Sequence, residues 1–155
     1  MSKVVINSHA EFEKFLGKLI GYSDYLQITQ EQINMFADAT LDHQWIHIDS
    51  ERAKKESQFG DTIAHGYLTL SLLPYLWEEI VDFRNIKMMV NYGIEDLKFQ
   101  DPVKVNSKVR LKAELTDIKN LRGITKTFMK ATLEIDGSNK PAFVATVVFI
   151  YHFEQ

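Results

Sequence analysis

Apolar residues recur at helical spacing in three stretches of the first eighty residues. The first helix is expected over about residues 8–20, where a Ser-x-x-Glu capping pattern precedes apolar positions three and four apart. A second helix begins after Thr29 with the same kind of pattern. The third, from Gly66 to Ile80, is apolar nearly all round, which predicts that other parts of the chain enclose it. Pro74 lies inside it and should bend it or remove one hydrogen bond.

The second half of the chain alternates in the manner of β-strands. Short turns such as Asp136-Gly137 predict antiparallel neighbours, and the strand-like segments are 88–99, 103–118, 124–135 and 141–153. We therefore expect a β-meander over about 86–153, wrapped around the third helix. The last segment is apolar on both faces, so the face turned away from the helix, to which we assign Val147, needs a cover such as a second subunit.

The periodicity is lost between Leu41 and Ile48, and this stretch holds the candidate chemistry. Asp42 and His47 are five residues apart, which is about 140° around a regular helix and opposite faces of a strand. Only an irregular segment can bring them to one water molecule. A carboxylate and an imidazole are suited to moving protons near neutral pH. The N–H of Gly66, at a helix start, could bind a carbonyl oxygen that gains charge.

Simpler interpretations exist for each of these residues. Asp42 would be a helix cap and His47 a satisfied, partly buried imidazole, while His65 would bond to a loop carbonyl and Gly66 would allow close packing. A metal site on His43 and His47 needs a regular helix, which would turn Asp42 away from His47. We therefore predict no metal.

Composition narrows the class of protein. The chain has 155 residues, enough for one domain with a sizeable core, and no cysteine, which fits a reducing compartment such as the cytoplasm. A net charge of −3 without a run of Lys or Arg argues against nucleic-acid binding. The N-terminus becomes polar too soon for a signal peptide, and no apolar run approaches the roughly 20 residues that span a membrane.

Residues 36–47 (FADATLDHQWIH) and 63–66 (IAHG) resemble the signature of the MaoC-like, or R-specific, enoyl-CoA hydratases. The variant DHQWIH with IAHG is closest to the nodulation protein N branch of that family. The similarity runs from about residue 28 to 151, since 98–99 and 101–103 match the family's Arg-Phe and Pro-Val positions. Gln44 and Trp45 replace asparagine and proline, as in that branch. Leu41 replaces the family glycine and fits neither the pattern of the family nor that of its nodulation protein N branch.

The resemblance implies an α+β hot-dog fold, with a single domain over residues 1–155. It implies reversible hydration of a trans-2-enoyl thioester of coenzyme A or acyl-carrier protein to the (3R)-3-hydroxyacyl thioester, without a metal or redox cofactor. Asp42 and His47 would be catalytic, and the Gly66 N–H, His65 and Gln44 would bind the substrate. The apolar last strand and the uncovered face of the sheet predict a homodimer or a higher oligomer, and the resemblance implies that the acyl tunnel runs near its interface.

Two other functions remain open at this point. Hot-dog proteins include acyl-CoA thioesterases that use a carboxylate, although the pairing of Asp42 with His47 favours a hydratase. A non-catalytic binder of acyl thioesters is the other alternative. Its support is Leu41, because a side chain in place of the family glycine could displace Asp42.

Overall fold

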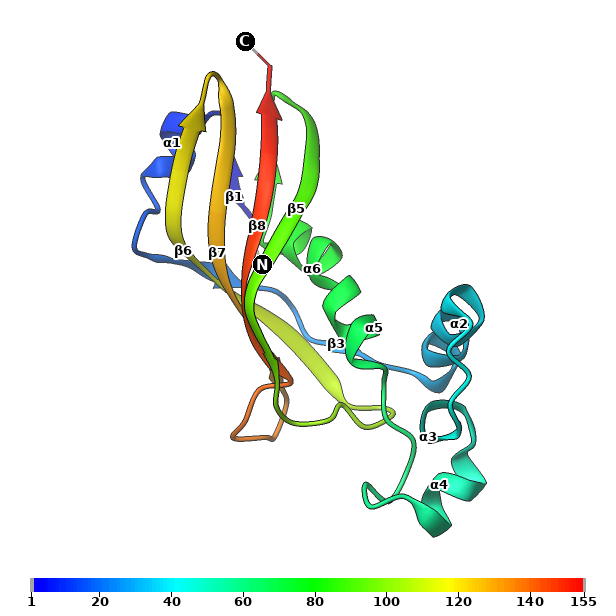
Figure 1. Ribbon diagram of the computed structural model, residues 1–155. Helices are drawn as coiled ribbons and strands as arrows, with labels where there is room; N and C mark the ends of the chain where they lie inside the picture. Colours follow the sequence, from blue (N-terminus) through cyan, green and yellow to red (C-terminus); the bar gives the residue numbers. More distant parts are fainter. Residues whose placement is uncertain (1, 155) are drawn as a thin grey trace.

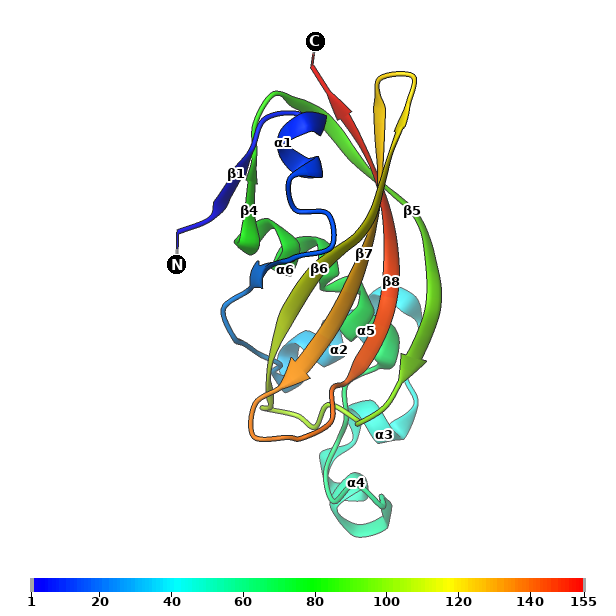
Figure 2. The same ribbon diagram turned by 90° about the vertical axis from the view of Figure 1, so that its left-hand side faces the viewer.

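A curved antiparallel sheet forms the body of the molecule in this computed structural model, which describes residues 2–154 (Figure 1). The strand order is β2-β6-β7-β8-β5, and the short β3 also pairs with β6. The bounds are β2 Leu19–Tyr22, β3 Leu26–Gln27, β5 Ile86–Phe99, β6 Lys108–Leu121, β7 Ile124–Ile135 and β8 Phe143–Phe153. The sheet wraps one face around helix α6 (Leu73–Ile80), as Figure 2 shows. The predicted α+β architecture, a sheet around a central helix, is confirmed.

The core lies between this helix and the inner face of the sheet. Alternate residues of β6 are buried, from Val109 to Leu115, as the period of a half-buried strand requires. From α6, Leu76 and Trp77 are fully buried, and the Trp77 indole N–H donates to the Tyr151 hydroxyl at 2.8 Å. Burial raises the pKa of that hydroxyl. The helix is therefore fixed to β8 by a hydrogen bond as well as by apolar packing.

Two predicted helices differ in the structure. The helix expected over about 8–20 is α1 (His9–Glu13), capped by Ser8, whose Oγ accepts from the Glu11 N–H at 3.3 Å. It ends early because Gly17 takes a left-handed conformation and its N–H bonds to Leu115 O of β6 at 2.8 Å, which leads the chain into β2.

The helix expected over 66–80 is divided into α5 (Gly66–Ser71) and α6, with Leu72 between them. Pro74 lies in the first turn of α6, where its missing N–H costs no hydrogen bond, so the break precedes the proline.

The predicted meander is correct only from β6 to β8. Strand β5 pairs with β8 and forms one edge of the sheet. Strand β8 is therefore internal, and the expectation that Val147 faces outward is wrong. Val147 is 4% exposed and belongs to the core on the helix side.

Three further helices lie beyond the end of α5, away from the sheet (Figure 1). They are α2 (Gln30–Thr40), α3 (Trp45–Ile48) and α4 (Ser50–Glu56). At the other end of α6, β4 (Val81–Phe83) pairs in parallel with β1 (Val4–Ile6). Over residues 2–154, the helices all fall short of the length and apolar character that a bilayer crossing demands. The segment from α2 to α5 places the candidate residues.

Candidate active site

Three side chains from separate segments meet near the start of α5. Asp42 follows α2, His47 lies in α3, and His65 directly precedes α5. One potential ligand atom from each lies within 4.8 Å of the other two. The predicted convergence of Asp42 and His47 is therefore present, because residues 42–44 are not helical and redirect the chain between α2 and α3.

Leu41 makes the turn that ends α2. Its φ of 66° and ψ of 17° place it in the left-handed region at the C-terminal cap, the conformation for which helices most often use glycine. A residue with a side chain is disfavoured there by roughly 1–2 kcal/mol. The Leu41 side chain is 80% exposed, so it points into solvent and does not displace Asp42. The departure from the glycine pattern thus leaves the site geometry intact.

Asp42 is held mainly by its own turn. Its Oδ1 accepts from the Gln44 N–H at 3.3 Å, and its side chain remains 51% exposed. Asp42 therefore shapes the turn that leads into α3, but the N-cap of that helix is Gln44, so the interpretation of Asp42 as a helix cap is wrong; its carboxylate stays accessible to a ligand. Gln44 is itself exposed and makes no side-chain cap bond.

His47 is 7% exposed and has one ring nitrogen committed. Its Nδ1 lies 2.7 Å from Ile63 O, and because a carbonyl only accepts, the proton is on Nδ1. Nε2 then carries a lone pair. Burial is the largest effect on the pKa of His47 and lowers it. The hydrogen bond to Ile63 and the charge of Asp42 raise this pKa, whereas the neighbouring His65 lowers it. Near neutral pH His47 is thus an uncharged imidazole able to take a proton.

His65 contacts both predicted catalytic residues. Its Nε2 lies 3.0 Å from the backbone O of Asp42, which confirms the expected bond to a loop carbonyl. Its ring stacks on the His47 ring with centroids 3.9 Å apart and an interplanar angle of 23°. The residue is 3% exposed, and its Nδ1 is buried without a hydrogen-bond partner in the part of the chain that the structure describes.

Gly66 is the first residue of α5, so its N–H has no partner within the helix. A Cβ at this position would lie 2.9 Å from Cε1 of Phe99, so the ring of Phe99 occupies the space that glycine leaves. The sequence marks Phe99, at the end of β5, only through the resemblance of residues 98–99 to the family's Arg-Phe pair. Nothing local to Phe99 in the sequence indicates this contact. Because α5 has only six residues, the Gly66 N–H is a local polar group and not the end of a long helix dipole.

The metal alternative built on His43 does not form. His43 is exposed and bonds to Asp38 Oδ1 at 2.8 Å, and Asp49 caps α4. The cluster contains His65 instead; its Nε2 donates to Asp42 O, His47 Nδ1 donates to Ile63 O, and each ring keeps one nitrogen without a hydrogen bond to the described residues.

We expect dialysis against a strong chelator to leave both activity and melting temperature unchanged, because the two imidazole rings of the cluster stack face to face, which does not direct their free nitrogens at one ion. Elemental analysis of the purified protein should show no stoichiometric zinc or iron. A metal that is lost together with activity would contradict this prediction.

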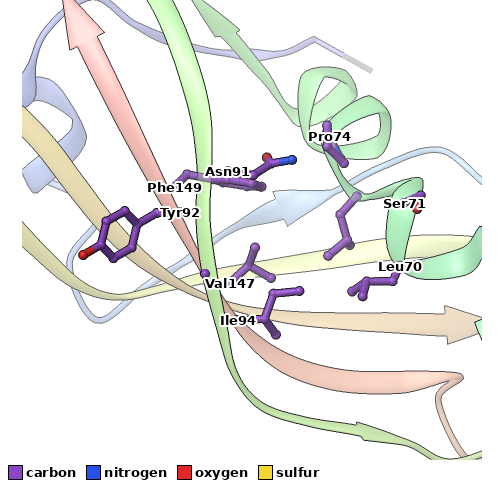
Figure 3. A pocket seen from close by; sticks show the side chains of 10 residues that line it. Leu70, Ser71, Pro74, Asn91, Tyr92, Ile94, Val147 and Phe149 are labelled. Atoms are coloured by element: carbon purple, nitrogen blue, oxygen red, sulfur yellow. The ribbon is translucent and has the colours of Figure 1, made fainter. Parts of the chain in front are cut away.

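A cavity of about 390 Å³ lies beside α5 and α6, against β5 and β8. Its apolar lining includes Leu70, Leu73, Pro74, Ile94, Val147 and Phe149. In Figure 3, Ile94 and Val147 point toward the helices, whereas Tyr92 points away from them. The candidate site residues do not line this cavity, but Leu70, which does, lies one helical turn beyond Gly66, about 6 Å along the axis of α5.

Comparisons with known proteins agree with this architecture. The MaoC like domain matches residues 11–137. A 3-hydroxyacyl-thioester dehydratase Z of Mycobacterium tuberculosis is 43% identical over 145 residues, covering 93% of this chain and 95% of that protein. Nodulation protein N of Rhizobium meliloti is 40% identical over 148 residues, covering 94% of this chain and 92% of that protein.

Solved structures share the fold at low identity. The R-hydratase PhaJ1 from Pseudomonas aeruginosa superposes with a TM-score of 0.73 at 20% identity, over 96% of this chain and 87% of that one. The (R)-hydratase from A. caviae superposes with a TM-score of 0.67 at 21% identity, over 86% of this chain and 94% of that one. The predicted hot-dog fold is therefore confirmed. With the sequence relatives above, it shows that the chain belongs to the MaoC-like dehydratase family and is a hydro-lyase of the hydratase/dehydratase type.

Proposed function

We propose that this protein adds water reversibly across the double bond of a trans-2-enoyl thioester, giving the (3R)-3-hydroxyacyl thioester, with residues 1–155 forming a single domain. The observation that carries the proposal is the meeting of the Asp42 carboxylate with a neutral His47 close to the start of α5. The thioester already activates the double bond, so neither a metal nor a redox cofactor is required. The absence of cysteine supports a cytoplasmic location.

One water molecule would be held between Asp42 and His47. The lone pair on His47 Nε2 takes a proton from this water as its oxygen bonds to C3 of the substrate. Asp42 and His47 together then return a proton to C2. H and OH are thus added across the double bond, and both residues regain their starting states. The negative charge that develops on the thioester oxygen would be stabilised by the Gly66 N–H.

The acyl chain would extend from the Gly66 N–H into the apolar cavity along α5. The cavity is lined by Leu70 and Leu73 on the helix side and by Val147 and Phe149 on the sheet side. Gln44, exposed at the start of α3, remains a proposed contact for the substrate. Either coenzyme A or acyl-carrier protein could supply the thioester.

Turnover of crotonyl-CoA tests the proposal against its two alternatives. A hydratase removes the enoyl absorbance without releasing a thiol, whereas a thioesterase releases free coenzyme A. If the protein binds enoyl thioesters but turns over none of a series of chain lengths, on either coenzyme A or acyl-carrier protein, the non-catalytic alternative is favoured and the proposal is overturned.

We also propose that the protein forms a homodimer through the edge strand β5. This strand has fourteen residues and, within the described sheet, a free edge, a feature that proteins usually cover or pair. Large apolar side chains along it are exposed in the single chain, namely Met88, Val90, Tyr92, Ile94 and Phe99. A stable pair commonly buries about 800 Å² per partner, a scale that an edge of this length can supply.

A charge on this edge should separate the subunits. Val90 is 42% exposed in the single chain, so Val90→Asp should leave the subunit folded while its charge opposes pairing. We expect light scattering at micromolar concentration to give a mass near 18.0 kDa for this variant and about twice that for the unaltered protein. Activity should fall with the loss of the dimer if the partner helps to form the substrate tunnel.

The matched control is Leu16→Asp, at a position 45% exposed in the turn after α1. It should keep both the dimer and the activity. A compact, fully active monomer of the unaltered protein would refute the dimer and the partner's contribution to the site together.

A further inference from the structure

We propose that His65 is a positioning residue, which holds Asp42 and His47 in their working arrangement instead of touching the substrate. The inference rests on the proposed function, because it assigns a role within the same site. It is carried by two direct contacts, one to each of the two catalytic residues, and by the burial of the His65 ring.

The first contact fixes the backbone at Asp42. This residue follows the left-handed Leu41 and lies in an exposed, non-helical segment, where its Oδ1 accepts from the nearby Gln44 N–H and its Oδ2 lies 3.9 Å from His65 Nε2. His65 comes from a distant segment, and its Nε2–H donates to the Asp42 carbonyl at 3.0 Å. That bond ties the exposed turn to the buried start of α5. Without it, the Asp42 carboxylate would lose its defined distance from His47.

The second contact fixes the plane of the His47 ring. The two imidazoles stack with centroids 3.9 Å apart, while His47 Nδ1 bonds to Ile63 O. A stacking surface and one hydrogen bond together determine both the tilt of the ring and its rotation. The direction of the free Nε2 lone pair follows from these two constraints.

The burial of His65 indicates that this residue contributes through its N–H and not through packing alone. The residue is 3% exposed, which leaves little surface for contact with a substrate. Its Nδ1 is buried and makes no hydrogen bond within the described residues, a costly arrangement that an apolar ring of similar size would avoid. The hydrogen bond that Nε2 donates to the Asp42 carbonyl therefore explains why an imidazole, and not an apolar ring, occupies this position.

His65 also affects the charge state of His47. The titratable groups that face His47 are His65, from the segment before α5, and Asp42, from the segment before α3. Burial is the larger cause that lowers the pKa of His47, and His65 lowers it further. Removing the ionisable ring at position 65 should therefore raise the pKa of His47 and move the acidic limb of the rate profile to higher pH.

Two substitutions separate the hydrogen bond from the ring. His65→Phe keeps a buried ring against His47 and removes the donor, whereas His65→Gln places an amide N–H near the position of Nε2 and removes the stack. We expect His65→Phe to lower kcat by about 10- to 100-fold with KM within about twofold, since a misplacement of about 1 Å can have this effect. His65→Gln restores the donor but not the stack, so its kcat should exceed that of His65→Phe by about threefold or more and still lie below the unaltered value.

Phe36→Leu is the packing control, because Phe36 contacts the His65 ring at a centroid distance of 4.9 Å without sharing its hydrogen bond. Its kcat should stay within about threefold of the unaltered value. Melting temperatures are measured for every variant. If His65→Phe does not fold, His65→Asn replaces it, since the shorter asparagine amide mimics Nδ1 and does not reach the Asp42 carbonyl. An unchanged kcat without the donor, or a rise in KM at constant kcat, would overturn the proposal.

Nuclear magnetic resonance of the unliganded protein provides a test that does not depend on turnover. The His47 ring signals should titrate at higher pH in both His65→Phe and His65→Gln. The backbone amide signals of residues 42–44 should shift in His65→Phe and stay nearly unchanged in His65→Gln. Amide signals that are unchanged in His65→Phe would overturn the positioning role. If the unaltered protein hydrates no thioester, the proposed function fails, while these spectra still decide the role of His65.

Discussion

Replacing either Asp42 or His47 by asparagine is expected to lower hydratase turnover by about 10²–10⁴-fold, the usual contribution of a general acid or base. Asp42→Asn removes the carboxylate charge with little change of shape. His47→Asn keeps an amide N–H near the Nδ1 position, so the bond to Ile63 O can persist while the Nε2 lone pair is lost. Turnover is measured by the loss of enoyl absorbance, and the affinity for an acyl-CoA product should change little.

His43→Asn is the matched control for these variants. His43 lies next to Asp42 in the sequence but is exposed and bonds to Asp38, outside the cluster. Its turnover should remain within about twofold of the unaltered protein, because exposed ion pairs contribute little. If Asp42→Asn and His47→Asn both kept more than about a tenth of the turnover, neither residue would act in proton transfer as proposed.

Gly66→Pro should lower kcat by about 10²–10³-fold, the loss that follows removal of one oxyanion donor. Proline at the first position of a helix fits the backbone and lacks the N–H, although it adds side-chain atoms that glycine does not have. The preceding residue, His65, already has φ −58° and ψ 135°, the conformation that proline requires before it. The substitution therefore deletes the proposed donor and leaves the path of the chain unchanged.

The control is Gly66→Ala, which keeps the N–H. Both substitutions add a Cβ that would meet Phe99 at 2.9 Å, so both need the half-exposed ring of Phe99 to move. Combining each with Phe99→Leu reduces this conflict. We expect the alanine variants to remain much more active than the proline variants, both with and without the Phe99→Leu substitution. Equal losses for alanine and proline would show that the crowding, and not the N–H, determines the effect.

The parts of the fold that depend on neighbouring residues could be predicted from the sequence. The two capping patterns begin helices at Ser8 and Thr29, where the side-chain oxygens accept from the backbone as expected. The hairpin turns join β6 to β7 and β7 to β8. The loss of periodicity after Leu41 indicated the turn that brings Asp42 and His47 together. These features are determined within a few residues of chain.

The remainder depends on contacts between distant segments. Strand β5 returns to pair with β8 instead of its neighbour β6, and no short-range pattern in 86–99 specifies that partner. The early end of α1 depends on Gly17 meeting Leu115, nearly a hundred residues away. The contact of Phe99 with Gly66 and the stack of His65 on His47 likewise join separate elements. A single sequence contains the residues for these contacts but not their pairing.

The side chains around the site are anchored largely to main-chain oxygens. His47 Nδ1 bonds to the carbonyl of Ile63, His65 Nε2 to that of Asp42, and the Gln30 amide to that of His47. Every amino acid has a carbonyl, so the accepting position is free to change its side chain during evolution without losing the bond. Insertions or deletions are different, because they move the carbonyl itself. In this region of the chain, spacing should therefore be inherited more strictly than the identity of the residues that supply the anchors.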